Sequence, residues 1–253
     1  MSSSKTPEQL EQEKRTAAHA ALGYVRNHMI LGLGSGSTAT YFLELLAEAV
    51  RRDGLAIEAV ATSLAIETKA AELGLRICGP RRGLRIDLDI DGADEIAPDL
   101  SLIKGAGGAL LREKIVARHS RRFFVIADSS KRVAQLGRRH VPLEVSTFAA
   151  PWVMDDVAGL GGKAELRMDQ RKPDEPFLTD QRNYLLDCDF GLIGDPSTSA
   201  ALAARLRDIP GVLDHGLFLG LARAAFIADG DEVTVLRPQC PPTPLAQAHL
   251  DLG

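Results

Sequence analysis

Residues 87–114, DLDIDGADEIAPDLSLIKGAGGALLREK, decide the fold class of this chain. They combine an alternating strand that ends in carboxylates, a lysine followed by a glycine-rich turn, and a helix that carries a glutamate among small apolar residues. Asp87, Asp89 and Asp91 alternate with apolar residues and therefore share one face of the strand. Open parallel α/β sheets bind ligands at the carboxyl ends of their strands, so the turn after Asp91 is the expected site.

Strand and helix patterns alternate on both sides of this stretch. Short apolar runs at residues 28–33, 57–61 and 123–127 predict buried parallel strands, and helical spacing lies between them. A further short strand is expected at residues 102–103. This alternation is typical of an α/β fold with a doubly wound, mostly parallel, Rossmann-like sheet.

The order of elements changes in residues 137–215, which predict the sequence βαββαβ with a polar loop at residues 169–180 and a last strand over residues 212–218. That order indicates a smaller inserted α+β domain of the ferredoxin-like type. The Rossmann-like domain is then expected to comprise residues 1–136 and 216–238, with a hairpin over residues 224–236. The proline-rich tail, residues 239–253, is predicted to be disordered.

Composition limits the classes of partner. The 253 residues are 45% hydrophobic and 25% charged, with a net charge of -4, which gives no electrostatic footprint for nucleic acid or an anionic membrane. The three cysteines lack CxxC spacing, which argues against a disulfide framework or a zinc site. No apolar signal segment or membrane span is recognised. A cytoplasmic protein is expected.

A glycine-serine loop follows the first predicted strand. Gly32, Gly34 and Gly36 precede a helix, where backbone N–H groups and the helix dipole attract an anion. Ser37 stands where a dinucleotide fingerprint has glycine, and a P-loop lysine is missing. A cradle for one phosphate group remains, and a tight turn with a serine or threonine cap is the alternative. The candidate residues are Ser35, Gly36, Ser37 and Thr38.

The carboxylates at the end of the aspartate strand differ in their expected roles. Asp91 and Asp94 lie where the strand ends and are the functional candidates. Asp87 and Asp89 lie earlier in the strand and are expected to be structural. Glu95 is expected to be a solvated turn residue.

Lys104 and Glu113 follow on consecutive elements. Lys104 precedes Gly105-Ala106-Gly107-Gly108, a second turn suited to anions. Helical geometry places Glu113 among small apolar residues, where desolvation would raise its pKa and suit a general base. A glutamate paired on an exposed helix is the alternative. With Lys104 supplying positive charge and no histidine nearby, no metal is expected.

Lys131 follows the last parallel strand and is a further ligand for a phosphate or sugar, with a solvated surface lysine as the alternative. The six histidines form no cluster in the sequence, and none is assigned to chemistry.

Five segments, in their order and spacing, closely resemble the A-type ribose-5-phosphate isomerase family. The resemblance runs from near residue 10 to near residue 236 and leaves out the proline-rich tail. The segments are GLGSGSTA (32–39), DIDGADEI (89–96), IKGAGGALLREKIVA (103–117), IADSSK (126–131) and PGVLDHGLF (210–218).

The resemblance implies interconversion of D-ribose 5-phosphate and D-ribulose 5-phosphate through an enediolate, in the non-oxidative pentose phosphate pathway, without metal or organic cofactor. It implies that Glu113 is the base, and that Asp91, Asp94 and Lys104 assist ring opening and stabilise the enediolate. It also implies a homodimer or homotetramer. The implied substrate-binding residues are Ser35, Gly36, Ser37, Thr38, Asp91, Gly92, Ala93, Asp94, Lys104, Gly105, Ala106, Gly107 and Lys131.

Three positions depart from the family pattern. Ser35 stands where threonine is common, and Ala106 replaces a frequent glycine. Leu64 and Ala65 follow Thr62-Ser63 where many relatives have more polar residues, so the contribution of that loop to substrate binding stays open.

Two other classes of function were weighed against the isomerase. A sugar-phosphate-sensing module would need a helix-turn-helix ahead of the sheet, and few residues precede the first strand. An acyl-CoA transferase with Glu113 as nucleophile is less compatible with the compact length.

Overall fold

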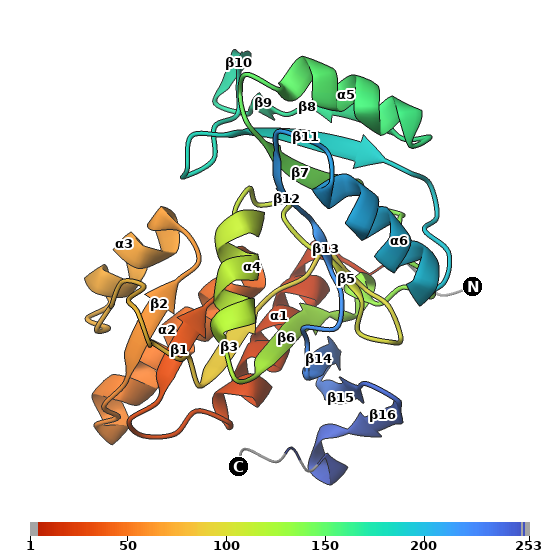
Figure 1. Ribbon diagram of the computed structural model, residues 1–253. Helices are drawn as coiled ribbons and strands as arrows, with labels where there is room; N and C mark the ends of the chain where they lie inside the picture. The colour runs from red at the N-terminus through yellow and green to blue at the C-terminus, as the bar shows by residue number, and fades with distance from the viewer. Residues whose placement is uncertain (1–4, 249, 251–253) are drawn as a thin grey trace.

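A seven-stranded sheet forms the centre of the computed structural model, which describes residues 5–248 and 250 (Figure 1). Its strand order is β16-β15-β14-β6-β3-β1-β2. Five strands, from β2 to β14, run parallel, and β15 and β16 add an antiparallel edge. The predicted mostly parallel α/β sheet is confirmed. The strands are β1 (Ile30–Leu33), β2 (Glu58–Ala61), β3 (Leu88–Asp91), β6 (Phe123–Asp128), β14 (Ala224–Asp229), β15 (Glu232–Arg237) and β16 (Cys240–Pro244).

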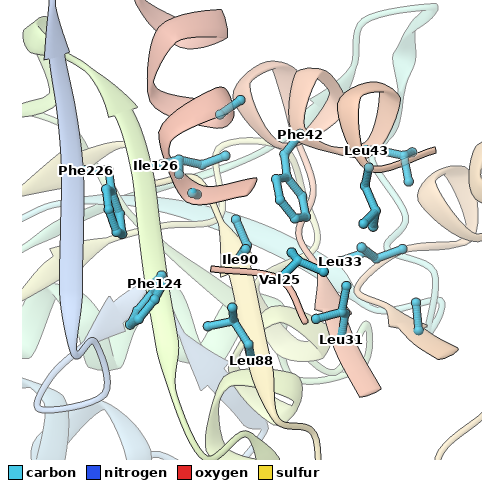
Figure 2. Packing of buried hydrophobic residues seen from close by; sticks show 14 of the residues in the cluster. Val25, Leu31, Leu33, Phe42, Leu43, Leu88, Ile90, Phe124, Ile126 and Phe226 are labelled. Carbon is cyan, nitrogen blue, oxygen red and sulfur yellow. The ribbon is translucent and has the colours of Figure 1, made fainter. Parts of the chain in front are cut away.

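Three helices cover one face of this sheet: α1 (Pro7–Leu22), α2 (Ser37–Asp53) and α3 (Leu64–Glu72). Their apolar residues join those of the strands in one buried cluster. Figure 2 shows Phe42 and Leu43 of α2 turned towards the strands. Each large apolar side chain buried in this way contributes roughly 1.5–3 kcal/mol, so the cluster fixes the helices on the sheet.

The helix α4 (Leu110–His119) lies on the other face. Side chains alternate across a strand, so the apolar residues of β3 enter the first cluster while Asp89 and Asp91 point to the side of α4. Val116 of α4 and the side chain of Asp89 both lie against Gly32 of β1. The aspartate face is therefore covered by a helix rather than open to water.

A second, four-stranded antiparallel sheet has the order β12-β7-β11-β8 (Figure 1). Numbered along the chain, this is the order fourth, first, third, second, which the predicted ferredoxin-like arrangement requires. Two helices share its apolar cluster. The elements are β7 (Val141–Val145), α5 (Ala150–Gly159), β8 (Lys163–Leu166), β11 (Tyr184–Asp189), α6 (Pro196–Arg207) and β12 (Val212–His215).

A three-stranded sheet, β13-β5-β4, connects the two units and corrects two expectations. Its strands are β4 (Glu95–Ile96), β5 (Leu102–Ile103) and β13 (Leu217–Phe218). The predicted continuous strand over 212–218 is split at Gly216, because its N–H donates to Pro142 O and its carbonyl accepts from Lys104 N. The short strand at 102–103 accordingly belongs to this sheet and not to the parallel one.

The tail and one loop are more ordered than predicted. Residues 240–244 form β16 against β15, and η2 (Leu245–Gln247) follows. A proline-rich segment can form an edge strand because its outward side needs no N–H donors. The predicted disorder is therefore wrong for residues 239–248, and residues 249 and 251–253 lie outside the described part. The polar loop expected at 169–180 contains the hairpin β9 (Met168–Asp169) and β10 (Lys172–Pro176).

The two larger sheets have separate apolar clusters. We propose that they mark two domains. The smaller one keeps the predicted boundaries, 137–215, since the four-stranded sheet lies wholly within this range. The larger one comprises 1–136 and the segment from 216 onward, which extends past the predicted end at 238 because β16 belongs to its sheet. No helix in the described part of the chain is long and apolar enough to cross a membrane.

Candidate active site

The site begins with the aspartates of β3, which are fully buried. Gly32 in the neighbouring strand β1 and Gly34 directly after it have no side chain that would overlap these aspartates. A Cβ on Gly34 would lie 2.2 Å from Asp91 Oδ1, and one on Gly32 would lie 2.4 Å from Asp89 Oδ1. These two glycines are thus needed for the carboxylates, whereas the left-handed turn itself is at Gly36, with φ 96°. Gly32 and Gly34 therefore serve the carboxylates rather than an anion loop, and for Gly36 the anion loop stays a prediction.

Gly34→Ala is expected to destabilise the fold by about 1–3 kcal/mol or more, because the new methyl group would overlap both the side chain and the backbone of Asp91. Urea unfolding would measure the loss. Gly79→Ala is the matched control, since a Cβ there meets nothing within 4 Å and needs no left-handed φ. Equal stability of the two variants would contradict the close contact.

Asp91 is held by three groups at the carboxyl end of β3. Its Oδ1 accepts hydrogen bonds from Ser35 N at 3.0 Å and from Gly92 N at 2.7 Å. Its Oδ2 lies 3.0 Å from Lys104 Nζ. The carboxylate therefore joins the glycine-serine loop to the lysine.

Lys104 follows β5 and its side chain is 3% exposed. Besides Asp91, its Nζ donates to Gly92 O at 2.7 Å and lies 3.3 Å from Glu113 Oε1. The ring of Phe218 lies 5.5 Å from Nζ on another side. One buried cation thus stands between two buried carboxylates.

Glu113 lies in the first turn of α4 and is 5% exposed. Oε1 faces Lys104, and Oε2 has no hydrogen-bond partner among the described residues. Of the two interpretations weighed from the sequence, the exposed surface pair is wrong. The carboxyl is buried and keeps one oxygen free to accept a proton.

Asp94 lies in the turn between β3 and β4, less deeply than Asp91. Its Oδ2 accepts a hydrogen bond from Ala106 N at 2.9 Å, in the turn that follows Lys104. Its charge also acts on Lys104 and on Glu113. The structure therefore brings together Asp91, Asp94, Lys104 and Glu113, as the sequence predicted.

The comparisons with known proteins agree on one family. The family model described as Ribose 5-phosphate isomerase A (phosphoriboisomerase A) matches residues 58–232. Ribose-5-phosphate isomerase A of Roseiflexus castenholzii is 48% identical over 230 residues, 90% of this chain and 95% of that one. The chain belongs to the ribose-5-phosphate isomerase A family. The predicted resemblance is confirmed.

Solved structures of the ribose-5-phosphate isomerase A fold support the same assignment. Ribose 5-phosphate isomerase from Plasmodium falciparum superposes with a TM-score of 0.86 at 34% identity, over 91% of this chain and 100% of that chain. A D-ribose-5-phosphate isomerase in complex with phospho-erythronic acid gives a TM-score of 0.86 at 36% identity, over 90% of this chain and 99% of that chain.

The site of this isomerase family member has an electrostatic pattern suited to a base. Burial raises the pKa of Glu113 to about 8, with Lys104 acting to lower it and Asp91 and Asp94 to raise it. Burial alone would lower the pKa of Lys104, but Asp91 and Glu113 outweigh it and the pKa is raised. The lysine remains a cation while the glutamate titrates close to neutrality.

The glycine-serine loop is only partly free to bind a ligand. Ser35 Oγ bonds to Thr62 Oγ1 at 2.8 Å and to Ser63 Oγ at 2.9 Å, so Thr62-Ser63 supports the loop. Ser37 is exposed at the first position of α2, and no side chain caps that helix at Gly36. The amides at the start of α2 are thus available to an anion.

Lys131 lies in η1 (Ser129–Lys131), directly after β6, and is half-buried. Within the described residues it forms no hydrogen bond or ion pair with Lys104 or Glu113, so its role in substrate binding stays a prediction.

Two residues were misjudged or missed from the sequence. Glu95 is not solvated: it is 1% exposed and accepts hydrogen bonds from Gly137 N and Arg139 N, which tie the start of the second unit to β4. Arg167 donates to the carbonyls of Gly105 and Ala106. Its place at the end of a predicted strand gave no signal, because the contact spans about sixty residues of chain.

Proposed function

We propose that Glu113, Lys104, Asp91 and Asp94 carry out the isomerisation of this family, in which D-ribose 5-phosphate and D-ribulose 5-phosphate interconvert through an enediolate. The observation that carries the proposal is the buried pair of Glu113 and Lys104, 3.3 Å apart, with one glutamate oxygen unpartnered among the described residues. A base beside a fixed cation is what proton abstraction next to a carbonyl requires.

The proposed steps follow from these positions. The Glu113 carboxylate removes the proton from C2 of the open-chain aldose, which places negative charge on O1 of the enediolate. The hydroxyl proton on O2 then passes to O1, and the protonated Glu113 returns its proton to C1, so the ketone forms at C2 and the base is regenerated. Lys104 remains charged and offsets the negative charge that develops on the enediolate oxygens. Asp94, at the more open side, exchanges protons with the sugar hydroxyls during ring opening. Asp91 orients Lys104 and supports the loop through Ser35 N.

The phosphate group of the substrate is proposed to bind at the start of α2, with Lys131 as a further ligand. The substrate-binding residues that the family resemblance implies also include Gly92, Ala93, Gly105 and Gly107, in the turns after β3 and Lys104. Support comes from the uncapped helix and the left-handed Gly36 that opens it.

Ser37→Ala combined with Thr38→Ala is expected to weaken binding of ribose 5-phosphate by about thirtyfold or more, because each of the two lost hydrogen bonds to an anion is worth about 1 kcal/mol or more. Isothermal calorimetry would measure it, with exposed Thr68→Ala as the control. Unchanged affinity in the double variant would place the phosphate elsewhere.

The activity itself is tested by a coupled assay of ribose 5-phosphate isomerisation, run on untreated and chelator-treated protein. Conversion in both samples supports the proposal without a metal or organic cofactor. No conversion in either would overturn the proposed activity, and restoration by a divalent ion would overturn the metal-free mechanism.

The pH dependence follows from Glu113. Its pKa is raised to about 8 in the folded protein, so below that pH the base is protonated and cannot accept the C2 proton. We expect kcat/KM for ribose 5-phosphate to rise with pH through a midpoint near 8, since kcat/KM reports the free protein. A profile that is flat across this region would contradict the assignment.

We also propose a cytoplasmic homodimer or homotetramer. The three cysteines are free thiols, as expected in a reducing compartment. The rings of Phe148 and Trp152 lie 5.3 Å apart, tilted by 59°, and the two residues are 78% and 60% exposed, an apolar surface of the kind that subunit contacts cover. Light scattering of the purified protein would give the number of subunits.

A further inference from the structure

Arg167 connects the four-stranded sheet to the turn that follows Lys104. It lies between β8 and β9, and its guanidinium holds both oxygens of Asp187 of β11, with Nε 2.8 Å from Oδ2 and Nη2 bonded to Oδ1. Its Nη1 donates to Gly105 O at 3.1 Å and to Ala106 O at 3.0 Å. The fork is thus fixed on one side by a carboxylate and directed at two carbonyls on the other.

The main chain of Arg167 is fixed as well. Its N–H donates to Leu185 O at 2.8 Å, and its carbonyl accepts from Phe177 N at 2.9 Å. The side chain is only 16% exposed. An arginine held at both ends in this way loses little further freedom when the site is occupied.

The peptide between Gly105 and Ala106 transmits this contact. In a trans peptide the C=O and N–H groups point in opposite directions. Gly105 O accepts from Arg167, and the N–H of Ala106, on the opposite side, donates to Asp94 Oδ2 at 2.9 Å. Arg167 and Asp94 therefore hold the two ends of one peptide, and a cation on the carbonyl strengthens the amide as a donor.

The next peptide is held in the same way. Ala106 O also accepts from Arg167, so the N–H of Gly107 is turned away from the guanidinium. The carbonyl sides of two successive peptides are thus fixed by one guanidinium, and the first of these peptides donates its N–H to Asp94. Gly105, at φ 107°, supplies the left-handed backbone that this turn needs.

We propose that Arg167, supported by Asp187, is a positioning residue for the isomerisation. It acts through the 105–107 turn, which it sets so that the amide of Ala106 holds Asp94 towards the reacting end of the sugar. This inference rests on the proposed function. If Arg167 has this role, the smaller domain, residues 137–215, contributes a residue that positions the reaction site.

The test compares four variants with the wild type: Arg167→Ala, Arg167→Lys, the double variant Arg167→Ala with Asp187→Ala, and the control Arg171→Ala, an exposed arginine four residues further on. We expect Arg167→Ala to lower kcat by about ten- to a hundredfold with a smaller change in KM, since a misplaced supporting group typically costs that much. Arg167→Lys should not rescue kcat, because an ammonium cannot hold a carboxylate and two carbonyls at once. Arg171→Ala should match the wild type.

The double variant separates positioning from stability. It removes the half-buried Asp187 together with its partner, so thermal unfolding should return towards the wild-type midpoint while kcat stays low. Millimolar ethylguanidinium should partly restore kcat of Arg167→Ala but not that of Glu113→Gln. Affinity for phospho-erythronic acid should fall in Arg167→Ala in parallel with kcat/KM.

Three results would overturn the inference. They are wild-type kcat in Arg167→Ala, recovery of kcat together with stability in the double variant, and full activity of the lysine variant. An inactive wild type would instead overturn the proposed function, so the two failures are distinguishable.

Discussion

Glu113→Gln is expected to lower kcat for ribose 5-phosphate by at least about two orders of magnitude, the contribution of a positioned general base. The amide has the size of the carboxyl but cannot accept the proton from C2. Lys104 keeps Asp91 and Gly92 O as partners, so the site retains its shape and substrate affinity should change little. Single-turnover rates and calorimetric affinities would separate the two effects. Turnover near that of the wild type would remove Glu113 from the mechanism.

The stability of the same variant gives an independent control. The folded-state pKa of Glu113 is raised from 4.5 to about 8, so its favourable contribution is complete below pH 4.5 and is lost as pH rises through about 8. Glutamine carries no charge to desolvate. Glu113→Gln should therefore become more stable relative to the wild type across this interval, by roughly 2–4 kcal/mol at its alkaline end. A constant difference between the two proteins at all pH values would contradict the raised pKa.

The chemistry of the site was predictable because it is local in sequence. Asp91, Asp94, Lys104 and Glu113 lie within 23 residues on consecutive elements, and strand and helix periodicity alone assign them to one edge of the sheet. The small apolar neighbours of Glu113 favoured its burial, with a paired glutamate on an exposed helix as the alternative. Roles in catalysis are a further step, and they remain proposals.

Contacts between distant segments could not be predicted in the same way. Gly34 was interpreted as part of an anion loop, but its lack of a side chain serves Asp91 on the adjacent strand. Glu95 lies in a stretch whose composition is typical of a surface turn. Its carboxylate is nevertheless buried and accepts hydrogen bonds from two backbone amides some forty residues later. Nothing in the sequence distinguishes Arg167 from the other arginines, because its hydrogen bond to the Gly105 carbonyl forms only in the folded protein. Such pairings depend on the tertiary structure and not on local propensity.

Lys104→Met is expected to cause the second large loss, about 10²–10³-fold in kcat, because it removes the cation that offsets the developing enediolate charge. Methionine has a volume similar to that of lysine and would fill the same space beside the Phe218 ring, so the loss of kcat would not arise from a cavity. Steady-state kinetics would measure it, with the exposed Lys163→Met as the matched control. Equal kcat in both variants would contradict a role for Lys104.

The remaining activity of Lys104→Met should carry a signature in its pH profile. Lys104 lowers the pKa of Glu113, so its removal should move the rise of kcat/KM to a higher pH than in the wild type. Stability should fall most at alkaline pH, by about 3–5 kcal/mol, because Asp91 and Glu113 would then be buried charges without their cation. At acid pH both carboxyls can take up protons, and the difference should narrow. A lower kcat with an unshifted profile would mean that Lys104 acts on the substrate alone and does not tune the base.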